Sequence, residues 1–168
     1  LWGSSVAVRP RGGKVQAGAV VFPELGEEFT ATLDGPARLN GQCICVSGID
    51  RWSEAVLTTG NATDPLSTAD AYSRLGSLAG KAQKIRMLGA ATVNLCYVAC
   101  GRVEAYFDYR IHLWDIAAGG LILERAGGIL DILRWHDAHT LQFIAATPGL
   151  HQPLREVVGQ DTTSTVGD

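Results

Sequence analysis

The chain has 168 residues and a formal net charge of -3, and 46% of its residues are hydrophobic while 18% are charged. This balance excludes an intrinsically disordered chain and predicts one globular domain with a buried core. No basic block indicates a nucleic-acid surface, and no run of about 18 or more apolar residues indicates a membrane span. We therefore expect neither nucleic acid nor a membrane among its partners.

The N-terminus and the cysteines point to the cytoplasm. The chain begins at Leu1 without a starting Met and shows no basic segment followed by an apolar one, so we expect a piece of a longer protein without a signal peptide. Cys43, Cys45, Cys96 and Cys100 lack the Cys-x-x-Cys spacing of zinc sites. They are predicted to be buried free thiols in a reducing compartment, and a four-sulfur zinc site is the less favoured alternative.

The first part of the chain has the pattern of antiparallel strands joined by tight turns. Strands are expected at residues 6–8, 15–22, 29–33, 37–41 and 43–46. Arg11-Gly12-Gly13 and Asn40-Gly41 are turn signals between them. Up to Ser47 the sequence therefore predicts a β-meander.

Strands and helices alternate in the rest of the chain. Strands are expected at residues 54–59, 84–88, 103–107, 129–133 and 141–146, and helices at 67–82, 90–100, 115–125 and from Pro148 onward. This order predicts an α/β fold in which helices pack on a mixed sheet. The domain is expected to cover residues 1–159, with a frayed polar tail at 160–168.

The stretch from Trp114 to Gly128 carries the most information about chemistry. Gly119 and Gly120 lie inside a predicted helix, where each costs about 1 kcal/mol relative to Ala, so another element is expected to approach the helix backbone closely. Asp115 lies at the start of that helix, where free N–H groups favour a carboxylate. Residue chemistry alone interprets Asp115 as the N-cap of a tightly packed helix.

The same stretch has the pattern W-D-x-A-A-x-x-L-x-x-x-A-G-G, which resembles the C-terminal signature of the inositol monophosphatase family. Residues 35–41 resemble a G-A-x-x-N-G motif of the family, and residues 89–107 resemble its helix and G-x-x-D-A-Y strand, in the same order. The resemblance implies a layered α-β sandwich of the sugar-phosphatase type, of which this chain is the C-terminal portion. It also implies a magnesium-dependent phosphatase that hydrolyses small phosphate monoesters such as inositol monophosphate.

By this resemblance, Asp115 is a ligand of Mg²⁺, which prefers hard oxygen ligands. Asp108 stands where the family usually has a Glu that accepts hydrogen bonds from substrate hydroxyls, and an exposed loop acid is an equally weighted interpretation. Gly89, Ala90 and Ala91 match a stretch whose backbone meets the substrate, with Ala90 in place of the usual hydroxyl residue. A tightly packed helix start explains these three small residues equally well.

Three further features have a weaker connection to the site. Gly60 and Asn61 line the substrate pocket if they match a Gly-Ser pair of the family, although a plain turn is the favoured interpretation. His112 is expected to be a packed or hydrogen-bonded His, because a metal-bound water is the nucleophile in the family. Residues 135–139 are predicted to form a hairpin tip and no metal site.

Most metal ligands of the family are absent from this sequence. Its D-P-x-D-G-[ST] motif and an earlier Glu-Glu element are not found, and Gly26-Glu27-Glu28 is interpreted as a solvated turn. One carboxylate cannot hold two metal ions, so we predict that the 168-residue chain is inactive and that its parent protein is active. The alternative is a non-catalytic binding or relic protein that retains the scaffold. An uncovered apolar sheet face, and with it association or a homodimer, is also expected.

Overall fold

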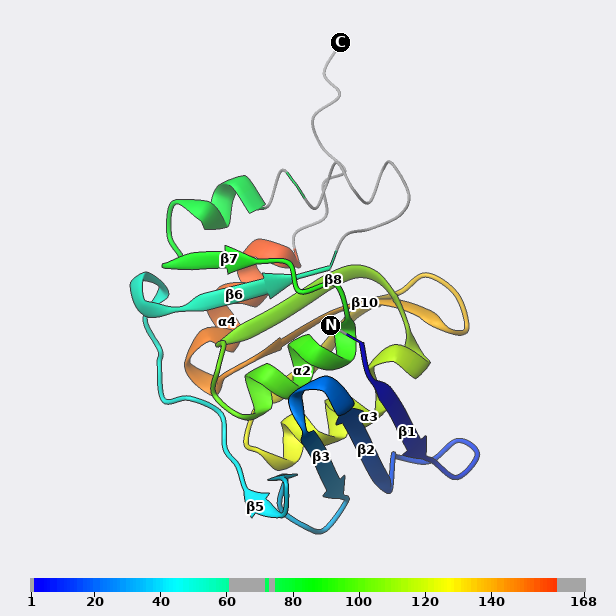
Figure 1. Ribbon diagram of the computed structural model, residues 1–168. Helices are drawn as coiled ribbons and strands as arrows, with labels where there is room; N and C mark the ends of the chain where they lie inside the picture. The colour runs from blue at the N-terminus through cyan, green and yellow to red at the C-terminus, as the bar shows by residue number, and fades with distance from the viewer. Residues whose placement is uncertain (1, 61–71, 73–74, 160–168) are drawn as a thin grey trace.

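The computed structural model describes residues 2–60, 72 and 75–159 of the chain. Two five-stranded sheets lie on either side of a layer formed by two helices, and a further helix covers the far side of the second sheet (Figure 1). The predicted α/β class and layered arrangement are confirmed. The prediction of a single mixed sheet is incomplete, because the strands of the meander pair with one another and form a sheet of their own.

The first sheet is an antiparallel meander, as predicted. Its strands follow chain order: β1 (Ser4–Val8), β2 (Ala17–Phe22), β3 (Glu27–Thr32), β4 (Arg38–Leu39) and β5 (Gln42–Cys43), with η1 (Pro23–Leu25) between β2 and β3. Alternate residues of β2 are buried against the helical layer, because successive side chains of a strand point to opposite faces. Gly18 is one of them, and a Cβ there would lie 3.0 Å from the Ala118 backbone.

The second sheet is mixed and has the order β7-β6-β8-β10-β9. Its strands are β6 (Val56–Thr59), β7 (Lys84–Arg86), β8 (Ala105–His112), β9 (Ile129–Trp135) and β10 (Thr140–Ala146), and η2 (Trp52–Glu54) precedes β6. β6 runs parallel to both β7 and β8, whereas β10 runs antiparallel to β8 and β9. Consequently the carboxyl end of β6 lies beside the middle of β8.

The helices divide the hydrophobic core in two. α2 (Ala91–Ala99) and α3 (Leu113–Arg125) lie between the sheets, where they bury side chains such as Leu95 and Ile122 with Phe143 of the second sheet. α4 (Pro148–Val158) packs on the opposite face of the second sheet, where Leu154 and Phe107 are buried. Of the helix expected at residues 67–82, residues 67–71, 73 and 74 lie outside the described residues, and residues 72 and 75–79 are helical.

The two glycines inside α3 confirm the predicted close approach. A Cβ at Gly119 would lie 2.8 Å from Leu95 of α2, and a Cβ at Gly120 would lie 2.8 Å from Leu130 of β9. Real Cβ atoms almost never come this close to a neighbour, so α3 can approach both α2 and β9 closely because it lacks side chains at these two positions.

Two element boundaries differ from the sequence prediction in a way that matters for the site. α3 begins at Leu113, so Asp115 is its third residue, and the N-cap position is held by His112 without a side-chain cap. β8 continues to His112, because pairing with β10 extends to the pair His112 and Thr140. Asp108 therefore lies within a strand and is 6% exposed, so its interpretation as an exposed loop acid is wrong.

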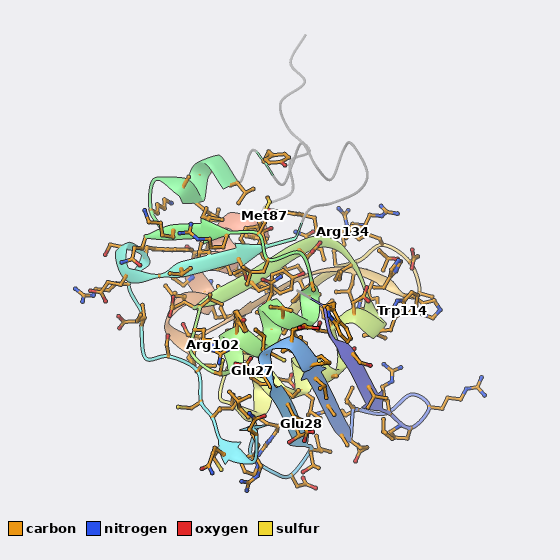
Figure 2. All side chains as sticks on the ribbon, viewed as in Figure 1. Glu27, Glu28, Met87, Arg102, Trp114 and Arg134 are labelled. Carbon is orange, nitrogen blue, oxygen red and sulfur yellow. The ribbon has the colours of Figure 1, made fainter. Side chains whose placement is uncertain are left out.

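The cysteines and the Glu-Glu turn also differ in part from expectation. Cys96 is buried as predicted and Cys100 is half-buried. Cys43 and Cys45 are exposed, because Cys43 lies in β5, the short edge strand of the first sheet, and Cys45 follows it. Glu27 is not merely solvated: the Arg102 guanidinium donates to both of its carboxylate oxygens, at 2.9 and 2.6 Å, which joins β3 to the loop after α2 (Figure 2).

One face of the first sheet is bare. Val6 and Val8 on β1 are 64% and 61% exposed, and a cavity of about 520 Å³ over this face is lined mainly by small and apolar residues of β1 to β3. This is the uncovered apolar face that the sequence predicts, and association through it remains a prediction. None of the helices in the described part of the chain is long and apolar enough to cross a membrane.

Candidate functional site

Asp108 is the centre of the candidate site. It lies on β8 with its side chain on the face that meets the helical layer, because it shares strand parity with buried Tyr106, which packs edge-on against Phe143. Its Oδ2 accepts a hydrogen bond from the Tyr106 hydroxyl at 2.9 Å, and its Oδ1 accepts one from the Arg110 backbone N–H at 3.1 Å. Both oxygens of this nearly buried carboxylate therefore have a protein donor.

Burial raises the pKa of Asp108 above its ordinary value. The hydrogen bonds from Arg110 and Tyr106 act in the opposite direction because they favour the ionised form, and the negative charge of Asp115 adds to the increase. A carboxyl group with a raised pKa and a specific set of partners is typical of a functional site, although structural networks can produce the same shift.

Gly60 lies directly against this carboxylate. Its backbone N–H donates to the Phe107 carbonyl at 3.4 Å, which extends the parallel pairing of β6 and β8 by one residue. A Cβ at Gly60 would lie 1.8 Å from the Asp108 Oδ2, so any side chain here would displace the acid. The structure thus brings Gly60 and Asp108 together. Asn61, the other predicted residue of this turn, lies outside the described residues.

Asp115 lies in the first turn of α3 and is half-buried. The free N–H groups of that turn favour a negative charge at this position, even though Asp115 is not the N-cap. It is close enough to the second sheet for its charge to raise the pKa of both Tyr106 and Asp108. The two predicted acids are therefore close enough for the charge of Asp115 to act on Asp108.

Gly89, Ala90 and Ala91 lead into α2, which contacts β8, the strand that carries Asp108. Gly89 has a positive φ of 86°, a conformation that glycine adopts without strain. Ala90 is the N-cap of α2 and makes no side-chain cap bond. Its carbonyl oxygen instead accepts a hydrogen bond at 3.0 Å from Nδ2 of Asn94, one turn into the helix.

Sequence reasoning missed two buried polar residues of this neighbourhood, Tyr106 and Asn94. The Tyr106 hydroxyl donates to the Asp108 Oδ2 at 2.9 Å, whereas the buried Oδ1 of Asn94 has no hydrogen-bond partner among the described residues. Burial, followed by the negative charge of Asp108, raises the pKa of Tyr106 well above its ordinary value, so the hydroxyl keeps its proton. The spacing of Tyr106 and Asp108 on one strand face was a usable signal, as was the single Asn in a mostly apolar helix.

The described residues do not by themselves form a magnesium cage. Among them, no group of three or more His, Cys, Asp or Glu side chains is placed to hold a metal ion. Asp115 supplies one carboxylate, whereas Mg²⁺ requires six oxygen ligands, partly from carboxylates and partly from water and substrate. The cavity of about 520 Å³ and a second one of about 360 Å³ beside α3 include neither Asp108 nor Asp115.

The histidines near the site have structural partners. Nδ1 of His112 lies 3.2 Å from the Thr140 hydroxyl, and its ring stacks on Trp114 with centroids 4.5 Å apart, so the prediction of a packed His is confirmed. Residues 136–139 form the predicted hairpin tip between β9 and β10. There Asp137 accepts hydrogen bonds from the backbone N–H groups of His139 and Thr140, which lower its pKa to about 2.

Two sheets enclose a helical layer, and a buried acid lies within electrostatic reach of a second acid at a helix start. These features define a layered α/β protein with an acidic polar site. A model of the inositol monophosphatase family matches residues 5–155. The Nus factor SuhB of Pseudomonas aeruginosa is 39% identical over 124 residues, which are 70% of this chain and 45% of that protein. The inositol monophosphatase of Dictyostelium discoideum is 35% identical over 111 residues, 64% of this chain and 41% of that protein.

Solved structures agree with this match. The IMPase of Thermotoga maritima has a TM-score of 0.81 at 32% identity, covering 92% of this chain and 59% of that one. SuhB of Mycobacterium tuberculosis has a TM-score of 0.82 at 29% identity, covering 92% and 62%. The chain belongs to the inositol monophosphatase family, and its fold is that of these two structures. It spans about half the length of the curated relatives that it matches.

Proposed function

We propose that this chain contributes the substrate-binding side of a magnesium-dependent phosphatase for small phosphate monoesters of the inositol monophosphate type. The observation that carries the proposal is the convergence of Asp108, Gly60 and the Asp115 helix start on one neighbourhood. Family membership supports phosphatase chemistry, and relatives bear the names inositol monophosphatase and fructose-1,6-bisphosphatase/inositol-1-monophosphatase.

In this proposal each residue has one task. Asp108 accepts a hydrogen bond from a hydroxyl group of the substrate, and the absence of a side chain at Gly60 lets the Asp108 carboxylate keep its position. The backbone of Gly89 to Ala91 also contacts the substrate in this proposal. Asp115 provides one oxygen ligand to Mg²⁺, whose remaining ligands are not found among the described residues, so no catalytic step is assigned to the metal here.

The missing ligand set implies that the 168-residue chain binds substrate without turning it over. A single carboxylate does not fix a metal ion well enough to activate water or to stabilise a leaving oxygen. The parent protein is proposed to be active, cytoplasmic and homodimeric. The alternative function, a non-catalytic binding or relic protein, is favoured by the same observation if no further ligands reach the site.

The direct test is binding and turnover of inositol 1-phosphate by the purified chain in the presence of Mg²⁺. We expect titration calorimetry to detect weak binding and a phosphate-release assay to detect no turnover. Asp108→Asn should weaken binding roughly tenfold, because a hydrogen bond to a charged acceptor is lost. Asp137→Asn, at the exposed hairpin tip, is the matched control and should leave binding unchanged.

Two outcomes would contradict the proposal. Measurable magnesium-dependent phosphate release by this chain would show that its metal site is more complete than proposed. Equal binding by the wild-type chain and by Asp108→Asn would remove Asp108 from the substrate site.

A further inference from the structure

Two of the four cysteines form a pair on the surface of the first sheet. Cys43 lies in β5, the edge strand of that sheet (Figure 1), and Cys45 follows it; both are exposed free thiols. Ile44 between them is half-buried and packs against the core. Because successive side chains of an extended segment point to opposite sides, both thiols point away from the core and lie on one side of the segment.

Arg38 places a positive charge beside this thiol pair. It is the residue directly opposite Cys43 in the pairing of β4 with β5, and directly opposite residues carry their side chains on the same face of a sheet. Arg38 is exposed, and its Nη1 donates to the Gly41 carbonyl at 2.7 Å, which holds the guanidinium at this hairpin. A cation held beside exposed thiols attracts a reactant that carries negative charge.

The two thiols can be joined if the segment between them bends. Residues two apart in an extended chain have Cα atoms about 6.6 Å apart, which is near the upper end of the range of about 4.4 to 6.8 Å that a disulfide accepts. Their Cβ atoms must also approach to about 3.8 Å, so the backbone at Ile44 has to turn. This turn strains the hydrogen bond from the Ile44 N–H to the Ala37 carbonyl, now 3.0 Å long. A strained and exposed disulfide is easily reduced again.

The residues that follow the thiol pair contact the ends of both helices between the sheets. The Val46 N–H donates to the Ala126 carbonyl, at the end of α3, at 3.0 Å. A Cβ at Gly101, after α2, would lie 3.2 Å from the backbone nitrogen of Ser47. A bend at Ile44 therefore acts on a segment that is packed against α2 and α3.

We propose that Cys43 and Cys45 form a thiol–disulfide exchange site for small anionic disulfides, with oxidised glutathione as the model reactant. The thiolate of one cysteine attacks a sulfur of the small disulfide, a mixed disulfide forms, and one small thiolate leaves. The thiolate of the other cysteine then attacks the protein sulfur of the mixed disulfide and expels the second small thiolate. The protein thiols lose two protons and two electrons in total, and the products are one protein disulfide and two molecules of the small thiol. The site shares no residue with the candidate phosphatase site and does not depend on its function.

The test incubates the reduced 168-residue chain with oxidised glutathione, blocks the remaining thiols with N-ethylmaleimide and identifies the products by peptide mass spectrometry. In the wild-type chain we expect a disulfide between Cys43 and Cys45 that dithiothreitol reverses. Cys43→Ser and Cys45→Ser should each instead keep a mixed disulfide with glutathione on the remaining thiol of the pair. Cys100→Ser removes a half-buried thiol outside the pair, so this matched control should react like the wild type.

Arg38→Gln tests the preference for an anionic reactant. This variant should react several-fold more slowly with oxidised glutathione, because the charge that attracts the reactant is lost. Its reaction with the uncharged bis(2-hydroxyethyl) disulfide should slow much less. Equal rates of the wild type and Arg38→Gln with oxidised glutathione would contradict the preference for anionic disulfides.

Hydrogen exchange of the Ile44 amide supplies a readout of the bend. The amide should exchange faster in the oxidised chain than in the reduced chain, because closure of the disulfide strains its bond to the Ala37 carbonyl. Three results would overturn the proposed exchange site: a wild-type chain that does not react, a wild-type chain that stops at the mixed disulfide, and a disulfide that pairs Cys45 with Cys100.

Discussion

The two sheets of this protein differ in how they are covered. The second sheet is packed on both faces, by α2 and α3 on one side and by α4 on the other, and its strands contribute to two separate cores. The first sheet is packed on one face, and Val6 and Val8 leave the other face apolar and open. The candidate site therefore lies on the sheet that is packed on both faces within this chain.

The largest expected effect contrasts a side chain of the doubly covered sheet with one on the open face. Leu57 on β6 is fully buried, so Leu57→Ala should lower the free energy of unfolding by about 3 kcal/mol through lost burial and a residual cavity. Val8→Ala removes a side chain that is already in water and should cost less than about 0.5 kcal/mol. Urea denaturation of both variants measures the difference.

Similar losses from the two variants would show that the open face is covered in solution, for example by association with a second chain. In that case the loss from Val8→Ala should depend on protein concentration, whereas the loss from Leu57→Ala should not.

A smaller effect is expected where the second sheet meets the site. Gly60→Ala should lower the free energy of unfolding by about 1 to 2 kcal/mol, because a Cβ there collides with the Asp108 carboxylate and forces it from its donors. Gly48→Ala is the control, since a Cβ at Gly48 meets no atom within 4 Å. Thermal unfolding of the two variants provides the measurement, and equal stability would mean that Asp108 moves aside freely.

The sequence predicts the elements well where the pattern is local. The meander, the helix with Gly119 and Gly120 and the hairpin around Asp137 all follow from spacing, small residues and turn chemistry, and the structure contains them. The exposed Cys43 and Cys45 show the limit of this reasoning, because residue type does not reveal which strand becomes the edge of a sheet.

The candidate site is predictable in part. Its acids are visible in the sequence through the family resemblance, but the burial of Asp108 depends on the pairing of β8 with β10 over a long sequence separation. The position of Asn94 relative to Tyr106 depends on how α2 packs against the second sheet. The sequence shows which residues share a strand face or a helix, but tertiary packing determines which of them meet.

The assignment of Asp115 as one ligand of a magnesium site beside Asp108 can be tested by replacing Mg²⁺ with paramagnetic Mn²⁺. The broadening of backbone amide NMR signals is then followed in the presence of inositol 1-phosphate. We expect signals around Asp115 and Asp108 to broaden first, and we expect Asp115→Asn to abolish this broadening while Asp137→Asn does not. Broadening that is centred on other acidic residues, or that persists unchanged in Asp115→Asn, would contradict it.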